Sequence, residues 1–297
     1  MMKRILILLL IGLVSVTACK GGGESGAAGG KIQIAGSTTI EGLTVEMAKA
    51  FKAQTGIDVI VRGGGSGRGV DGVLRDIIDI GNSSRDIKKP EIEALKNANV
   101  KTKRVKVGID GIIVVINKAI TGVTTLDVEQ VKKIFTGQIK NWKELGGPDK
   151  KIVVYTRDKK SGTGEFFNDT VLGKDVEKLI KTRIETTGNA DLAQKVSQDA
   201  QGIGYVGHGF AAQVADQVVQ VKLSHKAKNV TEFIEGTNEN IASMKYPISR
   251  YVYQFVRADK YKDNVKKFLD FMLSNPEITK KAGFLPVDAA VAVNDVW

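Results

Sequence analysis

KIVVYTRDKKSGTGEFF, residues 151–167, is the stretch that decides the fold. Its apolar first half predicts a strand, a turn rich in small residues follows, and Glu165-Phe166-Phe167 predicts the start of a helix. The first backbone N–H groups of a helix have no partner inside the helix and carry partial positive charge. A strand that meets a helix through such a turn therefore predicts a site for an anion.

Four residues of this turn suit a tetrahedral oxyanion. Arg157 supplies a planar fork of donors that matches two oxygens. Ser161 and Thr163 add hydroxyl donors, and Gly162 lets the backbone approach a ligand closely. An ordinary capped helix after a turn is the plainer interpretation of this segment by itself.

The same order of strand, small-residue turn and helix occurs twice more. It recurs at 36–39 after a strand at 31–34, and at 63–67 after a strand at 58–61. Strands and helices alternate along the chain, which predicts an α/β fold with a mostly parallel sheet covered on both faces. Ligands of such sheets bind beyond the carboxyl ends of the strands, where all three turns fall. The other expected strands are 80–82, 152–155, 203–206 and 218–221, and the expected helices are 43–56, 70–78, 90–98, 126–135, 165–172, 190–199 and 265–273.

Two extended runs predict that the chain crosses between two lobes. Residues 107–117 are too long and too apolar for a loop, and residues 250–256 form a second extended run. We therefore expect lobe 1 over 31–112 plus 252–297 and lobe 2 over 113–251. The three small-residue turns, each suited to an anion, then predict one ligand in the cleft between the lobes.

The N-terminus predicts export. Lys3 and Arg4 precede an apolar run at 5–16, which is too short to span a bilayer, so residues 1–18 read as a signal peptide. The small residues before Cys19 resemble a bacterial lipobox, which implies cleavage before Cys19 and lipid attachment to it. Residues 19–30 then form the lipidated cysteine and a glycine-rich tether. Because Cys19 is the only cysteine, the exported domain must be held by its core.

Composition argues against nucleic acid and against catalysis. The net charge is +11, but basic and acidic residues are interspersed, and the one dense basic cluster, at 101–106, alternates as an exposed strand would. Aromatic residues are 6% of the chain, too few for base stacking. The two histidines, His208 and His225, lack a partner pattern, and the glycine turn at 63–67 is no Walker loop. We expect no enzyme, no catalytic residue, no cofactor and no metal.

Eight segments, in order over residues 35–250, resemble a known family. The chain is similar to PstS-type phosphate-binding lipoproteins of bacterial ABC transporters, within the periplasmic-binding-protein superfamily. The resemblance implies a two-lobed type II fold, inorganic phosphate as ligand, membrane permease subunits as partners, and a monomer. The segments are 35–40, 64–67, 80–85, 110–112, 134–137 with 141–147, 157–163, 202–206 and 246–250.

The resemblance also implies the residues that bind phosphate. From the first lobe these are Thr38, Thr39, the Ile40 amide and Ser66, and from the second lobe they are Arg157, Ser161, Gly162 and Thr163.

The chain departs from the family at one position. Many relatives have an aspartate, which accepts the proton of hydrogen phosphate, where this chain has Ser84 and Arg85. We expect Ser84 and Arg85 to be additional donors and choose Asp110 as the acceptor, with Asp86 as the alternative. For Asp110, a hydrogen bond to the backbone of a crossing strand is the plainer interpretation. Sulfate or molybdate remains an alternative ligand, and a phosphate-ester hydrolase with Ser161 as nucleophile is an alternative activity.

Overall fold

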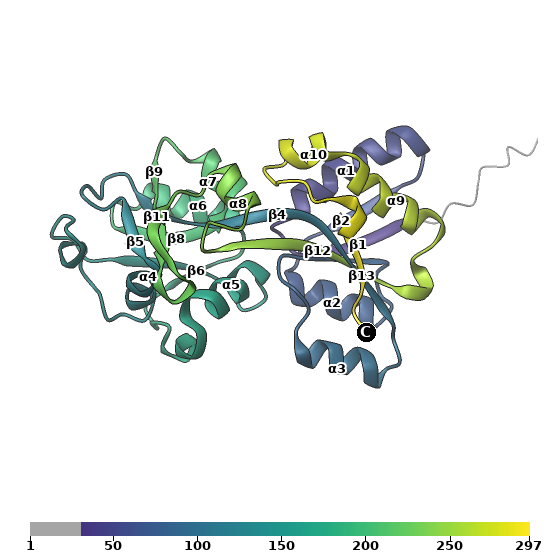
Figure 1. Ribbon diagram of the computed structural model, residues 1–297, viewed down its shortest axis with the longest axis horizontal. Coiled ribbons are helices and arrows are strands. Elements are labelled where there is room, and N and C mark those ends of the chain that lie inside the picture. The colour runs from purple at the N-terminus through teal and green to yellow at the C-terminus, as the bar shows by residue number, and fades with distance from the viewer. Residues whose placement is uncertain (1–30) are drawn as a thin grey trace, which may run out of the picture.

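The computed structural model describes residues 31–297, and the predicted signal peptide, Cys19 and the tether lie outside the described residues. Two lobes lie side by side along the long axis, and two long strands run through both (Figure 1). We call the lobe that contains the N-terminal strands lobe 1 and the other lobe 2. Within residues 31–297, no helix is long and apolar enough to cross a membrane.

Lobe 1 is built on three parallel strands in the order β2-β1-β3. They are β1 (Ile32–Gly36), β2 (Val59–Arg62) and β3 (Ile80–Ser83). The strands alternate with helices, as the sequence pattern predicts. The helices are α1 (Glu41–Thr55), α2 (Ser66–Leu74), α3 (Lys89–Asn97), α9 (Asp263–Ser274) and α10 (Pro276–Lys281).

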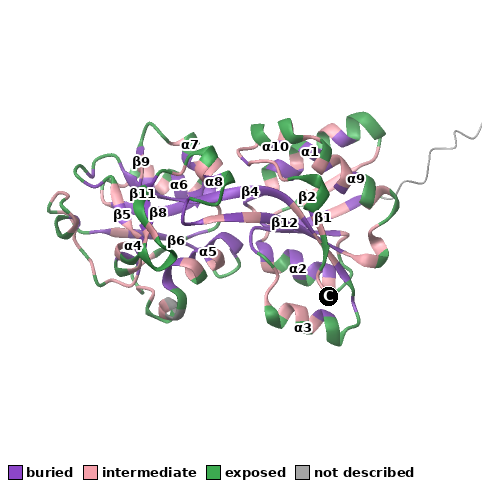
Figure 2. Cartoon of the chain, in the orientation of Figure 1, coloured by how far each residue is buried: buried purple, intermediate pink, exposed green. Residues whose placement is uncertain are grey.

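The two crossing strands are β4 (Thr102–Asn117) and β12 (Ser249–Arg257), which pair antiparallel with each other. In lobe 1, β12 also pairs with β3, and the short strand β13 (Val293–Asp295) pairs with the start of β4. In lobe 2, the second half of β4 pairs with β8 (Gly202–Gly207) and β9 (Val218–Gln220). Both strands are largely buried where they pass between the lobes (Figure 2).

Lobe 2 has a parallel sheet in the order β8-β6-β7, with β6 (Val153–Arg157) in the middle and β7 (Ile184–Thr186) at the edge. A second, three-stranded sheet is formed by β5 (Thr125–Asp127), β10 (Lys222–His225) and β11 (Val230–Ile234). The helices are α4 (Val128–Phe135), α5 (Gly162–Phe167), α6 (Asn189–Gln198), α7 (His208–Gln213) and α8 (Asn238–Ala242). Short 3-10 turns occur at 142–145, 173–178, 226–228, 258–260 and 289–291, and a π-helical turn occurs at 168–172.

Each lobe has its own hydrophobic core. In lobe 1, α1 packs on α9 through Phe51 and Phe268, whose ring centroids lie 5.3 Å apart edge to face. In lobe 2, Phe167 of α5 stacks on Tyr205 of β8 with centroids 3.8 Å apart. Each such fully buried side chain contributes about 1.5–3 kcal/mol. The buried residues of one core fall within 109–248 and those of the other within 32–107 and 252–284, while the exact lobe boundaries stay predictions.

Several element boundaries differ from the predicted ones for local reasons. The helix predicted at 70–78 begins at Ser66, directly after Gly65 in a positive-φ conformation. The helix predicted at 126–135 begins at Val128, because Asp127 accepts from Gln130 N and forms a capping box. The predicted mostly parallel sheet holds within each lobe, whereas the crossing strands pair antiparallel.

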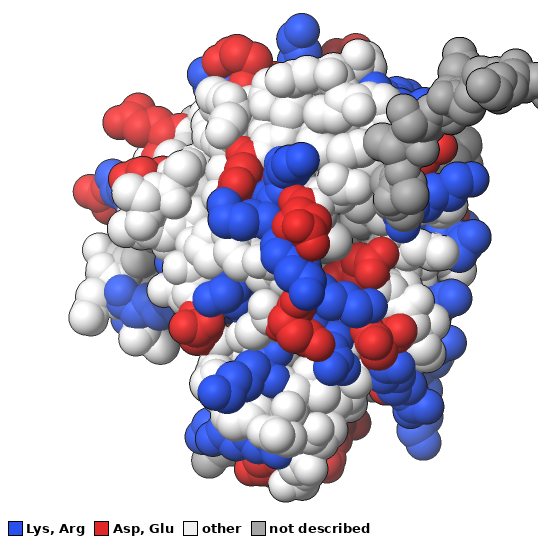
Figure 3. Space-filling view, turned by 90° about the vertical axis from the view of Figure 1, so that its right-hand side faces the viewer, with Lys and Arg blue, Asp and Glu red and all other residues white. Residues whose placement is uncertain are grey.

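The basic cluster at 101–106 is the start of β4. Two of its four charges are paired with carboxylates, with Lys103 Nζ 2.8 Å from Asp295 Oδ1 and Arg104 Nη1 2.5 Å from Asp86 Oδ2. Figure 3 shows the face of lobe 1 at the right of Figure 1, where basic and acidic side chains alternate. The excess positive charge therefore forms no single-sign surface on this face.

Candidate functional site

The three small-residue turns meet in one cleft between the lobes. Lobe 1 contributes the turn after β1 and the glycine turn before α2, and lobe 2 contributes the turn between β6 and α5. The lobes touch here, because a Cβ on Gly65 of lobe 1 would lie 2.1 Å from the Lys160 carbonyl oxygen of lobe 2. The structure therefore has the lobes closed on each other.

The lobe 1 wall consists of hydroxyls held by backbone groups. Gly65 N donates to Gly36 O at 2.8 Å, which joins the first turn to the glycine turn. Ser66 Oγ accepts from Ser84 N at 3.0 Å and lies 3.3 Å from Ser84 Oγ, and both side chains are buried. Ile40 places its side chain in the core and its backbone N–H at the start of α1.

The lobe 2 wall is the N-terminus of α5. This helix begins at Gly162, three residues before the predicted start, and Ser161 is its N-cap, accepting from Gly164 N at 3.1 Å. The first turn of α5 therefore lies at the cleft, where Gly162 approaches Ser66 of lobe 1. A Cβ on Gly162 would lie 2.0 Å from Ser66 Oγ, so only glycine permits this approach of the two lobes.

Arg157 brings a buried positive charge to the cleft from the last position of β6. Its side chain is 6% exposed, and Nη2 donates to Thr38 Oγ1 at 3.1 Å and to Thr187 O at 3.2 Å. Among the described residues, Nε and Nη1 are buried and have no hydrogen-bond partner. Burial lowers the pKa of Arg157, but a guanidinium remains charged in proteins. A buried cation with two unused donors is costly unless an anion binds it.

A second guanidinium, that of Arg250, lies behind the cleft. Its Nε and Nη2 donate to Asp110 Oδ2 at 3.1 and 2.7 Å, across the pairing of β12 with β4. Its Nη1 donates to Ser84 O at 2.7 Å and its Nη2 to Thr163 Oγ1 at 2.9 Å, so it contacts both walls. Burial lowers the pKa of Arg250, and the Asp110 carboxylate opposes that shift. Sequence reasoning missed Arg250, although it ends the family-like segment at 246–250.

A chain of polar side chains connects the lobes at the back of the cleft. Thr39 Oγ1 of lobe 1 and Thr163 Oγ1 of lobe 2 lie 2.6 Å apart. Asn189, the first residue of α6, donates from Nδ2 to Thr39 Oγ1 at 3.1 Å. Asn189 was also missed, and its place directly before the predicted helix at 190–199 was the available signal.

Arg85, Asp86 and Asp110, the ionisable residues predicted near the ligand proton, lie in different surroundings. Arg85 is buried, but its guanidinium donates to Glu91 and Glu165. Asp110 is buried, and its Oδ1 accepts from His208 N at 3.2 Å while Oδ2 accepts from Arg250. Asp86 lies on the outer surface, where it pairs with Arg104.

In the described part of the chain, neither imidazole makes a hydrogen bond to a cleft hydroxyl, although His208 and Thr39 line the same hollow. His208 lines a hollow next to α10, and His225 lines a separate hollow on lobe 2. Within residues 31–297, no group of three or more His, Cys, Asp or Glu side chains is arranged to hold a metal ion.

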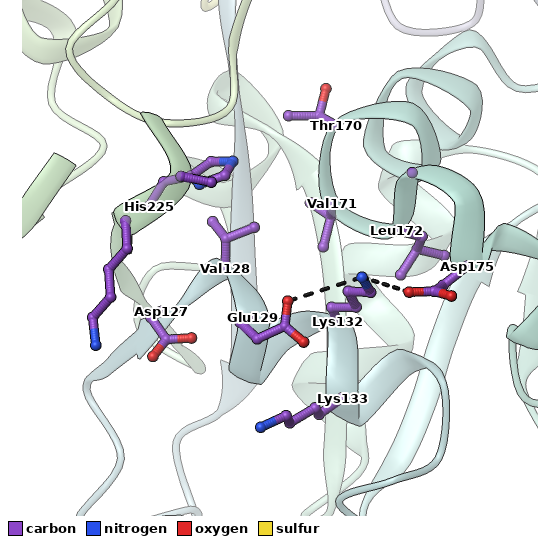
Figure 4. Close-up of a pocket in the computed structure, with 13 residues that line it drawn as sticks. Asp127, Val128, Glu129, Lys132, Lys133, Thr170, Val171, Leu172, Asp175 and His225 are labelled. Atoms are coloured by element: carbon purple, nitrogen blue, oxygen red, sulfur yellow. Dashed lines mark ion pairs between the residues drawn. The ribbon is translucent and has the colours of Figure 1, made fainter. Parts of the chain in front are cut away.

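The lobe 2 hollow is drawn in Figure 4 and shares no lining residue with the anion cleft. Its walls come from α4, the turns around 170–175 and the end of β10, and it contains none of the predicted site residues. Lys132 Nζ lies 2.5 Å from Asp175 Oδ2 and 3.9 Å from Glu129 Oε2, so its charge is already compensated. Lys133 and Lys226, which also line the hollow, are exposed, so the cleft with the buried, unpartnered nitrogens of Arg157 is the better candidate for binding an anion.

The geometry agrees with comparisons to known proteins. A family model described as the PBP superfamily domain matches residues 22–276. The phosphate-binding protein PstS of Staphylococcus saprophyticus is 34% identical over 264 residues, which cover 86% of this chain and 79% of that protein. The chain belongs to the PstS family of this superfamily. The PstS protein of Staphylococcus aureus strain USA300 is 31% identical over 279 residues, covering 90% of this chain and 83% of that protein.

Solved structures of the PstS family have the same architecture. A structure from Clostridium perfringens, described as a phosphate ABC transporter substrate-binding protein with bound phosphate, is 29% identical with a TM-score of 0.77, covering 87% of this chain and 100% of that one. An ABC-type phosphate transport receptor from Vibrio cholerae is 26% identical with a TM-score of 0.70, covering 86% and 100%. The predicted two-lobed type II fold with two crossings is confirmed.

Proposed function

We propose that this PstS-family chain is an extracytoplasmic receptor that binds inorganic phosphate between its lobes and delivers it to an ABC-type import permease. The observation that carries the proposal is Arg157, a buried guanidinium whose Nε and Nη1 have no partner among the described residues. Its relatives named for phosphate binding supply the class of ligand. The role is that of a binding protein and not of an enzyme.

Phosphate is bound from both lobes. The lobe 1 donors are Thr38, Thr39, the Ile40 amide, Ser66 and Ser84, and the lobe 2 donors are Arg157, Ser161, the Gly162 amide and Thr163. Arg157 supplies the charge and the fork, since charge-assisted hydrogen bonds are about twice as strong as neutral ones. Arg250 supports the site through Thr163, whose hydroxyl accepts from Nη2. Because Thr39 Oγ1 lies 2.6 Å from Thr163 Oγ1, one of these two hydroxyls donates to the other, and the second keeps its proton for a ligand. Arg85 stands next to this set with its donors engaged by carboxylates.

Asp110 accepts the proton of hydrogen phosphate and so disfavours sulfate, which has none at neutral pH. Burial beside the cleft supports this choice, because the Asp110 side chain is 1% exposed, whereas that of Asp86 is 45% exposed. Asp110 Oδ1 accepts one hydrogen bond, from His208 N, and a carboxylate oxygen has room for a second.

The chain acts as a monomer held at a bacterial membrane. A lipid on Cys19 and the tether at 20–30 keep the domain at the membrane surface, and the lobes are 31–112 plus 252–297 and 113–251. Its partners are phosphate and the permease subunits, with no nucleic acid and no cofactor.

Titration calorimetry tests the ligand directly. Protein freed of phosphate should bind phosphate with one site per chain and bind sulfate and molybdate at least about tenfold more weakly. Equal or tighter binding of sulfate or molybdate would make the chain a receptor for that oxyanion. A chromogenic phosphate ester should show no sustained turnover, and multiple turnovers that vanish in Ser161→Ala would instead support a hydrolase.

A further inference from the structure

A cluster of ion pairs joins the two lobes beside the anion cleft. Arg85 follows β3 in lobe 1, and its Nη1 and Nη2 donate to the carboxylate of Glu91 on α3 at 2.8 and 2.7 Å. Its Nε donates across the cleft to Glu165 Oε2 on α5 of lobe 2. Lys88 Nζ of lobe 1 lies 3.1 Å from the other oxygen, Glu165 Oε1. Both oxygens of Glu165 are thus bound from the opposite lobe.

These pairs are adjacent in the chain to the residues proposed to bind phosphate. Arg85 directly follows Ser84, and Glu165 is two residues beyond Thr163 in the first turns of α5. Glu165 N donates to Ser161 O at 2.8 Å, so Glu165 and residues 161–163 belong to one turn of the helix. Closure of the lobes therefore forms the Arg85–Glu165 pair and the anion-binding site together.

The lobe 1 side of the cluster is held by hydrogen bonds within lobe 1. The two-pronged bond to Glu91, together with a bond from Nη1 to Asp86 O at 2.9 Å, fixes the guanidinium plane from within lobe 1. Only Nε then faces lobe 2. Exposed ion pairs contribute little to stability, but the Arg85 side chain is 5% exposed and that of Glu165 is 24% exposed, so water and salt screen this pair less.

We propose that Glu165 is a positioning residue that holds the lobes closed over the anion by binding Arg85 and Lys88, without contacting the ligand. The inference rests on the proposed phosphate-binding function and adds a determinant of how long phosphate stays bound. A contact made only in the closed form raises the population of that form, and ligand release then requires the contact to break.

Replacing Glu165 tests this with two readouts. Glu165→Gln keeps the shape of the side chain but removes its charge, so we expect release of labelled phosphate in an isotope-dilution chase to accelerate about three- to tenfold. The dissociation constant from calorimetry should rise by the same factor, because association is unaffected. Lys88→Gln should give a smaller effect in the same direction. Glu129→Gln, the same change at an exposed pair elsewhere on lobe 2, should leave both values unchanged.

The outcomes distinguish failure of this inference from failure of the proposed phosphate-binding function. If the parent binds phosphate but Glu165→Gln and Lys88→Gln release it at the parental rate, the interlobe pair has no role in retention. If Glu165→Gln instead binds more tightly, the freed Arg85 contacts phosphate directly and the proposal is wrong. If the parent binds no phosphate, the receptor function fails and this inference fails with it.

Discussion

Replacing Arg157 with alanine should weaken phosphate binding by about two orders of magnitude. The guanidinium has two buried nitrogens, Nε and Nη1, without partners among the described residues. Two hydrogen bonds to a charged ligand, at about 1.5 kcal/mol each as a lower value, amount to about 3 kcal/mol. At about 1.4 kcal/mol per tenfold, this corresponds to about a hundredfold increase in the dissociation constant.

Two further variants separate charge from geometry. Arg157→Lys keeps the charge but loses the planar fork, so it should bind about tenfold more weakly than the parent, between the parent and the alanine variant. Arg62→Ala removes a guanidinium from the exposed end of β2 and should bind like the parent. The assay is calorimetric titration of phosphate into protein freed of phosphate.

The same variant makes a prediction about the unliganded protein. Because Arg157 is buried with unused donors, its removal should not lower the melting temperature of the free protein. The rise in melting temperature on adding phosphate should shrink, since binding to the folded state stabilises it by a free energy that grows with the logarithm of the phosphate concentration divided by the dissociation constant. Phosphate binding by Arg157→Ala within threefold of the parent would refute the reasoning.

Three other predictions concern closure, selectivity and pH. Gly162→Ala should weaken phosphate binding by about tenfold in calorimetry, because its Cβ would meet Ser66 Oγ at 2.0 Å and keep the lobes apart; parental affinity would show that the lobes close differently. Asp110→Asn should narrow the preference for phosphate over sulfate about tenfold. It should also lower the melting temperature, because it leaves the buried guanidinium of Arg250 without its counter-ion. If Asp110→Asn keeps the preference and Asp86→Asn loses it, Asp86 is the acceptor. Burial lowers the pKa of His208 and outweighs the opposing effect of Asp110, so the unfolded chain binds this proton more readily. Its contribution to stability is therefore complete above about pH 6.5 and is lost as the pH falls, and His208→Gln should reduce the drop in melting temperature between about pH 7.5 and 5.5; an unchanged drop would exclude His208 as its source.

Local sequence signals were sufficient for the framework of the fold. The order of strands and helices, the long crossing strand and the anion turn at Arg157 are all encoded within short windows. Apolar periodicity, capping residues and glycine turns act over a few residues, so they can be read from one sequence. The strand-turn-helix pattern at 151–167 was therefore enough to predict Arg157, Ser161, Gly162 and Thr163 as candidate anion-binding residues.

The remainder depends on contacts between distant segments. Arg250 and Asp110 are 140 residues apart, and Arg85 and Glu165 are 80 residues apart, so no periodic pattern links them. The second sheet of lobe 2 was missed for the same reason: β5 is three residues long, and β11 carries mostly exposed side chains. Such strands are fixed by their partners rather than by their own composition.

The most direct test of the central claim is a crystal structure of the protein grown with phosphate. We predict one phosphate in the interlobe cleft, with oxygens within hydrogen-bond distance of Arg157 Nε and Nη1, Ser161 Oγ and the Gly162 amide, and with lobes closed as here. Phosphate bound only elsewhere, for example beside Lys132 in the hollow of Figure 4, or a cleft whose Arg157 makes no contact with the bound anion, would contradict the account.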